Sequence, residues 1–244
     1  MDPERQPLPG VVSASRMEAR TLECAGRRFR PLVNLPTRIC GIGSERAARA
    51  AQELLAQGCG ALVSWGFAGA LVPRLRRGDL LVPARVVDAD GSGIEVDVHW
   101  HRRMQQALAP APTLCTQTLL QASAAVLTAE AKAALFASSR AAAVDMESAT
   151  LGAVANAAGV PFLAVRAIVD IHSDSLPVWV AHALDDSGRL AARVVLTGLL
   201  RRPGDLSKLL RLARGVAAAR ASLARAARLA GPRLLAGHDA SAPS

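Results

Sequence analysis

Short apolar runs alternate along this chain with alanine-rich segments of helical periodicity. One run, LAVRAIV within residues 161–169, is apolar at every position but one, as a strand covered by helices on both faces requires. Alternation over the whole length predicts one α/β domain in which helices cover both faces of a central sheet. The expected strands are 10–13, 38–42, 61–65, 79–87, 113–119, 141–145 and 161–169, and the expected helices are 45–56, 129–136, 147–158, 180–200 and 205–229.

The composition favours a folded core in a reducing compartment. Of the 244 residues, 51% are hydrophobic and 20% are charged, which excludes a disordered chain. The cysteines are scattered without a CxxC pair, so a disulfide-stapled secreted scaffold and a zinc ribbon are both disfavoured. The first ten residues contain charges and three prolines, unlike a signal peptide. We therefore expect a cytoplasmic protein.

The formal net charge of +9 is concentrated near the C-terminus. Residues 201–233 carry nine basic side chains and one acid, so the remainder of the chain is nearly neutral. Alanine, leucine and arginine dominate this segment and predict a basic C-terminal helix over about 205–230. Its apolar residues recur at helical spacing, at Leu206, Leu209, Leu210, Ala213 and Val216.

Three interpretations of this basic helix remain open. It can pack on the domain with a solvated arginine face, bind anionic lipid at the inner membrane face, or bind nucleic acid. We disfavour nucleic acid, because the chain has no Tyr and only seven Phe and Trp residues to stack on bases.

Three acidic residues follow expected strands, where ligands bind in open α/β sheets. Glu18 follows the first strand, Glu147 the sixth and Asp170 the seventh. Each has a structural alternative, since an acid can favour a helix dipole or cap a turn. The GIG turn at 41–43 lacks the third glycine of a dinucleotide-binding loop and is only a weak anion-binding signal.

Converging carboxylates suit the transfer of a glycosyl group. Two carboxyl groups can act as acid and base around an oxocarbenium-like transition state, and burial can keep one of them protonated near neutral pH. No GxSxG or Cys–His pattern indicates a covalent nucleophile. His99 and His101 have no third ligand nearby, so we expect no metal and place them in a loop at a pocket rim or subunit contact. No cofactor is expected.

Two segments of the chain are similar to the signatures of one enzyme family. VDMESATLGAVANAAGVPFLAVRAIVD, at 144–170, and SWGFAGALVPRLRRGDLLVP, at 64–83, resemble the superfamily of purine nucleoside phosphorylases and methylthioadenosine/S-adenosylhomocysteine nucleosidases. The resemblance extends from about residue 8 to 169. It implies a single domain over 1–244 with the mixed sheet of the nucleoside phosphorylase fold, and a core over about 8–200. The tail is similar to one branch, the hopanoid-associated phosphorylases.

The resemblance also implies roles for individual residues. Asp170 matches the acid that protonates or hydrogen-bonds purine N7, and Glu147 the carboxylate that holds the ribose hydroxyls. Met146 matches the residue beneath the sugar, and Glu18 the carboxylate that orients an attacking water. Arg166 matches a strand arginine near that site and is a further catalytic candidate.

Other matching positions include departures from the family pattern. Phe67 and Val169 stand where relatives carry small hydroxyl residues, and Ser64 replaces an arginine that binds phosphate in bacterial phosphorylases. Arg16, Arg20 or a neighbouring subunit can supply the missing charge, so water and phosphate both remain open as nucleophile. The further substrate-binding candidates are Gly66, Phe67, Ser13 and, in a base slot near 123–126, Val126.

These observations together predict an enzyme that cleaves the N-glycosidic bond of a 5′-modified adenosine. By resemblance the substrate is adenosylhopane, and the products are adenine and a ribosyl or phosphoribosyl hopane of hopanoid lipid biosynthesis. The alternatives are a soluble methylthioadenosine/S-adenosylhomocysteine-type nucleosidase and a non-catalytic nucleoside- or nucleic-acid-binding protein. We expect a homo-oligomer that binds a small or lipid-linked nucleoside and does not bind nucleic acid. We also expect a peripheral contact of the protein with an anionic membrane.

Overall fold

The computed structural model describes residues 7–26, 34–111, 113–177, 179, 197 and 201–235. Apart from residue 197, the helix expected over 180–200 lies outside this part of the chain. The strands are β1 (Pro9–Ser13), β2 (Thr37–Ile39), β3 (Ala61–Ala70), β4 (Leu80–Leu81), β5 (Arg85–Val87), β6 (Gly93–Glu95), β7 (Leu114–Cys115), β8 (Leu119–Gln121), β9 (Ala143–Asp145) and β10 (Phe162–Asp170). The α-helices are α1 (Arg16–Gly26), α2 (Ser44–Ala56), α3 (Val98–Leu108), α4 (Ala129–Ser139), α5 (Ser148–Ala157) and α8 (Leu206–Ala230), and 3-10 turns cover Pro203–Asp205 and Gly231–Leu234.

The strands form one mixed sheet, as expected. Its order is β6-β5-β8-β9-β3-β10-β4-β7, with β1 also pairing with β3, and β2 with β1. The long central strands β3 and β10 are parallel, whereas β9 and β4 pair with them antiparallel. The carboxyl ends of β1, β3 and β10 therefore lie at the same edge of the sheet.

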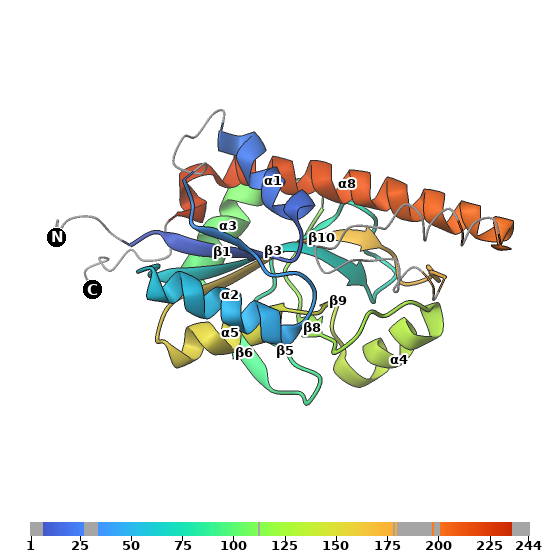
Figure 1. Ribbon diagram of the computed structural model, residues 1–244, viewed down its shortest axis with the longest axis horizontal. Helices are drawn as coiled ribbons and strands as arrows, with labels where there is room; N and C mark the ends of the chain where they lie inside the picture. The colour runs from blue at the N-terminus through green and yellow to red at the C-terminus, as the bar shows by residue number, and fades with distance from the viewer. Residues whose placement is uncertain are drawn as a thin grey trace.

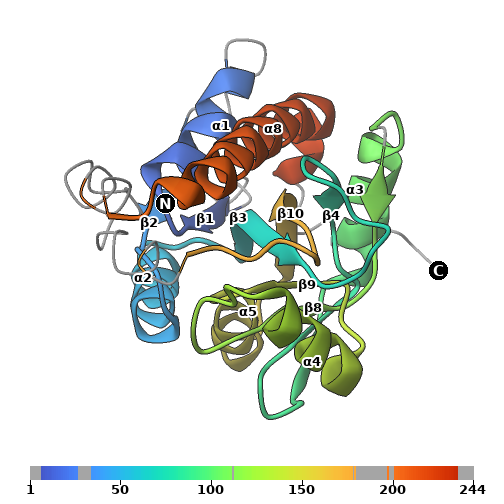
Figure 2. The ribbon, with the colours of Figure 1, turned by 90° about the vertical axis from the view of Figure 1, so that its right-hand side faces the viewer.

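Helices cover both faces of this sheet (Figures 1 and 2). Helices α1, α3 and α8 lie on one face, and α2, α4 and α5 lie on the other. Two large apolar clusters fill the space between the layers, one including side chains of α8 and α3, the other including those of α2 and α5. The prediction of one α/β domain, with helices on both faces of a central sheet, is thus confirmed. In the described residues, no helix is long and apolar enough to cross a membrane.

Several boundaries differ from the sequence prediction. The strand expected at 61–65 continues to Ala70, and the strands expected at 79–87 and 113–119 each divide into two. Helices α1 and α3 were not expected. His99 and His101 lie in α3 instead of a loop, and the buried His101 ring bonds the Val82 carbonyl at 2.9 Å through Nε2.

The placement of α3 has a local cause. Asp97 caps its N-terminus, because the Asp97 carboxylate accepts the backbone N–H of Trp100 at 2.7 Å. The Trp100 indole is fully buried and donates to the carbonyl of Arg233 at 3.0 Å. Capping and aromatic burial therefore convert the expected loop into a helix of the core.

Helix α8 changes character along its 25 residues. Its second half is buried through small and apolar residues that approach β10, α1 and α3. Gly215, near the middle of the helix, also approaches β10 closely, because a Cβ atom there would lie 1.9 Å from the backbone oxygen of Val169. The C-terminal helix is thus part of the core, and Gly215 sets its separation from the strand that ends in Asp170.

We expect Gly215→Ala to lower the free energy of unfolding by about 1–3 kcal/mol, because the added methyl group forces α8 away from β10. Thermal and denaturant unfolding measure this loss. Gly204→Ala is the matched control, since a Cβ atom at Gly204 meets nothing within 4 Å. Equal stabilities of the two variants would contradict this account of the contact.

Candidate active site

A cavity of about 930 Å³ opens at the carboxyl ends of the central strands. Its wall includes all three acids that the sequence singled out, namely Glu18 from α1, Glu147 at the start of α5 and Asp170 at the end of β10. Met146, Phe67 and Val126 line the same cavity. The structure thus brings together six of the nine predicted site residues.

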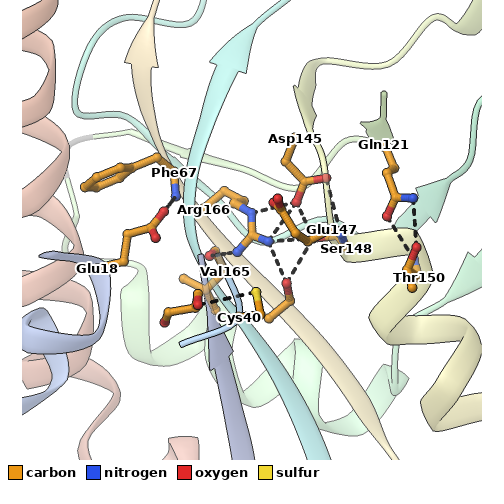
Figure 3. A network of polar contacts seen from close by, with 12 residues as sticks. Glu18, Cys40, Phe67, Gln121, Asp145, Glu147, Ser148, Thr150, Val165 and Arg166 are labelled. Carbon is orange, nitrogen blue, oxygen red and sulfur yellow. Dashed lines mark hydrogen bonds and ion pairs between the residues drawn. The ribbon is translucent and has the colours of Figure 1, made fainter. Parts of the chain in front are cut away.

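Hydrogen bonds hold Glu18 from two sides, and Figure 3 shows the one from Phe67. The Glu18 Oε2 accepts the backbone N–H of Ser15 at 2.6 Å and the Ser15 hydroxyl at 2.8 Å, and its Oε1 accepts the N–H of Phe67 at 2.8 Å. A Cβ atom at Gly66 would lie 2.6 Å from Oε1, so only glycine leaves room for this carboxylate. Burial raises the pKa of Glu18, although these hydrogen bonds oppose the shift.

Arg166 lies behind the carboxylates rather than on the cavity wall. The guanidinium is 3% exposed and donates through Nε to Asp145 at 2.8 Å. Its Nη2 donates to the Ser64 hydroxyl at 2.5 Å and to the Ser148 hydroxyl at 2.8 Å. Figure 3 shows the side chain at the centre of this polar network. Arg166 therefore holds Asp145 in place, and the catalytic role that we expected for Arg166 stays a prediction.

Glu147 connects α5 to the turn before α2. Its Oε1 accepts the backbone N–H of Gly43 at 3.0 Å, and Gly43 has a φ of 113°, which glycine adopts without strain. Burial, followed by the charge of Asp145, raises the pKa of Glu147 from 4.5 to about 7. The GIG turn therefore positions the carboxyl group of Glu147 through a backbone N–H.

Asp170 faces two quite different neighbours. On one side the backbone of Gly69 passes so close that a Cβ atom there would lie 3.1 Å from Oδ1. On the other side the ammonium group of Lys132, from α4, forms an ion pair with Oδ2. Burial raises the pKa of Asp170, and the Lys132 charge opposes that shift. Our sequence analysis missed Lys132, whose alanine-rich surroundings give no local signal of a site.

Two predicted binding residues lie outside the cavity lining. Gly66 contacts Glu18 from behind, as described above. Ser13, at the end of β1, is buried, and its hydroxyl has no hydrogen-bond partner among the described residues. Of the two, only Gly66 is thus in close contact with one of the three acids. Direct contact of Ser13 or Gly66 with a substrate is not supported by this arrangement.

The apolar stripe that the sequence predicts on the C-terminal helix has an unexpected place. All of its members, together with Leu212, line the cavity. Leu206 and Leu210 are also 49% and 48% exposed, so this wall of the cavity reaches the molecular surface. In Figure 1 the first half of α8, drawn in orange, extends beyond the sheet. The cavity therefore joins a polar floor of carboxylates to a long apolar wall.

Comparisons with known proteins agree with this fold. The chain matches the phosphorylase superfamily over residues 38–201, and it belongs to that family. It is an enzyme of the nucleosidase and phosphorylase class. No curated protein sequence matches the chain. Neither the family match nor the similar structures distinguish the hopanoid-associated branch that the tail resembles.

Solved structures of nucleosidases share the fold. A mutant methylthioadenosine nucleosidase of Helicobacter pylori, with 5′-methylthioadenosine in its active site, has a TM-score of 0.63 at 21% identity, covering 81% of this chain and 100% of that chain. The methylthioadenosine/S-adenosylhomocysteine nucleosidase of Neisseria meningitidis, in complex with methylthio-immucillin-A, has a TM-score of 0.67 at 16% identity, covering 91% and 98%. Futalosine hydrolase of H. pylori has a TM-score of 0.61 at 20% identity, covering 85% and 97%.

The raised pKa of Glu147 predicts how stability depends on pH. The unfolded chain releases this proton near 4.5, whereas the folded chain retains it to about 7, so stability falls as the pH rises between these values. Glu147→Gln removes the titration. We expect it to raise the free energy of unfolding by roughly 1–3 kcal/mol above pH 7, with no gain below 4.5.

Denaturant unfolding over a pH series checks this expectation. Glu23→Gln, on the exposed side of α1, is the matched control and should follow the wild-type curve. Parallel curves for wild type and Glu147→Gln would show that Glu147 does not titrate in this range.

Proposed function

We propose that the protein cleaves the N-glycosidic bond between adenine and the ribose of a 5′-substituted adenosine. The observation that carries this proposal is the single cavity lined by Glu18, Glu147 and Asp170. In the proposed reaction Asp170 donates a proton to the purine, Glu147 binds the ribose hydroxyls and Glu18 orients the nucleophile. Such a division of labour suits an oxocarbenium-like transition state, because the base must leave as a neutral group.

Burial supports the acid role of Asp170. A carboxyl group removed from water prefers its neutral form, and burial raises the pKa of this one. Met146 and Phe67 line the same cavity as the acids, so they are placed to exclude water around the sugar. Val126 comes from the segment before α4, which lines the cavity beside Asp170, and we assign it to the base slot.

The hydrogen-bond donors near Glu18 favour water over phosphate as the nucleophile. The N–H groups of Ser15 and Phe67 both point at the Glu18 carboxylate, and the Arg166 guanidinium is held by Asp145 and two hydroxyls. Arg16 and Arg20 are exposed on α1. The N–H groups near Glu18 already donate to its carboxylate, so a phosphate ion would meet a negative charge and no free donor from these groups. A water molecule can donate a hydrogen bond to the carboxylate.

The apolar wall supplied by α8 supports a large apolar 5′ substituent. The cavity volume lies near the upper end of the range of about 300–1,000 Å³ that is usual for small-molecule sites. Leu206, Leu209 and Leu210 extend its lining to the surface, where a long group can leave the site. With the resemblance of the tail, this supports adenosylhopane as substrate and a ribosyl hopane as product. A methylthioadenosine-type nucleosidase is the second candidate, favoured by the ligand in the similar H. pylori structure.

Release of adenine from adenosine derivatives tests this function, and Asp170→Asn is the diagnostic variant. General-acid assistance is typically worth about 10²–10⁴-fold, so we expect turnover of the folded variant to fall by that factor. The thermal unfolding midpoint should also fall, because the buried Lys132 ammonium group loses its counter-ion. The substrates are 5′-methylthioadenosine and an adenosine with a long alkyl group at the 5′ position. Chromatography of adenine and mass spectrometry of the sugar measure the outcome.

Each result has a defined meaning. A rate independent of phosphate, with an unphosphorylated 5-substituted ribose as the sugar product, supports hydrolysis, whereas a 5-substituted ribose 1-phosphate would overturn the assignment of water. Higher kcat/KM for the long alkyl substrate supports the lipid-like substituent, and the opposite order favours the methylthioadenosine reading. Near-normal turnover by Asp170→Asn would remove the proposed acid, and no adenine release at all would favour a non-catalytic binding protein.

The surface around the apolar wall suits an anionic membrane. Residues 206–235 contain no acid, and Arg211 and Arg214 are exposed on the half of α8 that lines the cavity. Exposed leucines beside arginines are typical of helices that lie in the lipid headgroup region. We propose that this end of α8 rests on the membrane and that the cavity takes its lipid-like substrate there.

Vesicle flotation with phosphatidylserine-containing and pure phosphatidylcholine vesicles tests this docking. Deletion of the helix is unsuitable, because its second half belongs to the core. Each basic residue near an anionic surface contributes about 1 kcal/mol, so we expect Arg211→Glu with Arg214→Glu to weaken binding at least about tenfold. The control, Arg46→Glu with Arg49→Glu, makes the same charge change on α2, across the sheet. Equal loss in both pairs would argue against docking through α8.

A further inference from the structure

Lys132 is a buried cation for which the proposed reaction gives no role so far. It is one of only two lysines in a chain rich in arginine, and its side chain is 1% exposed. It projects from α4 toward the end of β10 and forms an ion pair with Asp170. A buried ammonium group is unfavourable unless it is paired, so this pairing is a defined feature of the fold.

All three donors of the Lys132 ammonium group are used within the protein. Besides Asp170, it donates to the carbonyl of Ile171 at 2.8 Å and to the carbonyl of Asp174 at 3.3 Å. An ammonium group has three N–H donors and no acceptor. Lys132 is therefore saturated and is also absent from the cavity lining. Of the three groups that Lys132 contacts, only Asp170 lines the cavity.

A second ion pair holds the segment that follows β10. Arg77, from the loop between β3 and β4, donates through Nη2 to the Asp174 carboxylate at 2.6 and 2.5 Å. The Asp174 carboxylate also accepts the N–H of Ile171 at 2.9 Å. The charged groups that face Asp170 are thus Lys132 from α4, Asp174 from the following segment and Arg77 from the preceding loop.

We propose that Lys132 is a positioning residue that orients Asp170 and stabilises the carboxylate which forms when Asp170 gives its proton to the base. This inference rests on the proposed function. As the glycosidic bond breaks, its electron pair moves to the base. The proton of Asp170 passes to a purine nitrogen, and Asp170 is left ionised beside the Lys132 ammonium group. The Lys132–Asp170 contact in this structure shows that the ammonium group is in place to stabilise that carboxylate.

Loss of the Lys132 charge should change the pH profile of kcat/KM. Without Lys132, burial and Asp174 both raise the pKa of Asp170 further, and Arg77 opposes them from behind Asp174. The neutral acid then persists to higher pH but donates its proton less readily. The alkaline limb of the kcat/KM profile should therefore move upward while its maximum falls.

The test compares Lys132→Met, which removes the charge at similar volume, with Lys132→Arg, which retains it. We expect Lys132→Met to reduce kcat about ten- to a hundredfold and to shift the alkaline limb upward, and Lys132→Arg to restore part of both. Lys208→Met is the matched control, because this other lysine bonds Asp205 outside the cavity lining. It should leave the rate and the pH profile unchanged.

A double-mutant cycle separates action through Asp170 from a merely structural role. In the Asp170→Asn background, Lys132→Met should cause no further loss of kcat, since the group on which it acts is gone. An equal loss in both backgrounds, or an unshifted pH profile, would overturn the proposal. If Lys132→Met alone does not fold, the double variant removes both buried charges and should fold, and the profile of Lys132→Arg then decides. Full activity of Asp170→Asn would instead refute the proposed function itself.

Discussion

The buried guanidinium of Arg166 is the interaction on which the arrangement of the site depends. It joins β10 to Asp145 at the end of β9, to Ser64 in β3 and to Ser148 in α5. Its charge lies close enough to Glu18 and Glu147 to oppose the rise in the pKa of both. Removing it would leave Asp145 as an uncompensated buried charge, which is typically destabilising by about 3–5 kcal/mol. Arg166, on a central strand of the core, is therefore the counter-ion of Asp145, and its charge favours the ionised forms of Glu18 and Glu147.

Helix α8 shows how one element serves both the core and the site. Its second half packs through Ala219, Leu223 and neighbouring small residues against the sheet and α1. Its first half presents apolar side chains to the cavity and leaves leucines partly in water. The second half anchors the helix, so the first half can remain open without loss of the fold. This division places an apolar wall of the cavity close to its carboxyl groups.

Much of the site was predictable because its residues stand at strand ends in chain order. Glu18 follows β1 and Asp170 ends β10, and the carboxyl ends of these parallel strands lie at one edge of the sheet, whereas Glu147 follows β9, which runs antiparallel to β3 and pairs with the carboxyl end of β3. Lys132 was missed because its partner is 38 residues away and its own helix gives no periodic signal. His101 was misplaced because the Asp97 cap and the burial of Trp100 decide between loop and helix. Ser13 and Gly66 were expected at the substrate, but neither lines the cavity: Ser13 is buried at the end of β1, and Gly66 lies against the Glu18 carboxylate.

The sequence by itself determined the class of fold, the identity of the acids and the apolar stripe near the C-terminus, because hydrophobic periodicity and strand-end positions are local properties of a chain. Only the tertiary structure decided what each acid has as a partner and where the stripe points. Arg166 pairs with Asp145, and Lys132 pairs with Asp170. The apolar stripe faces the cavity instead of the core. These contacts join residues distant in the chain, and they depend on how the layers pack and on which charges burial forces to pair.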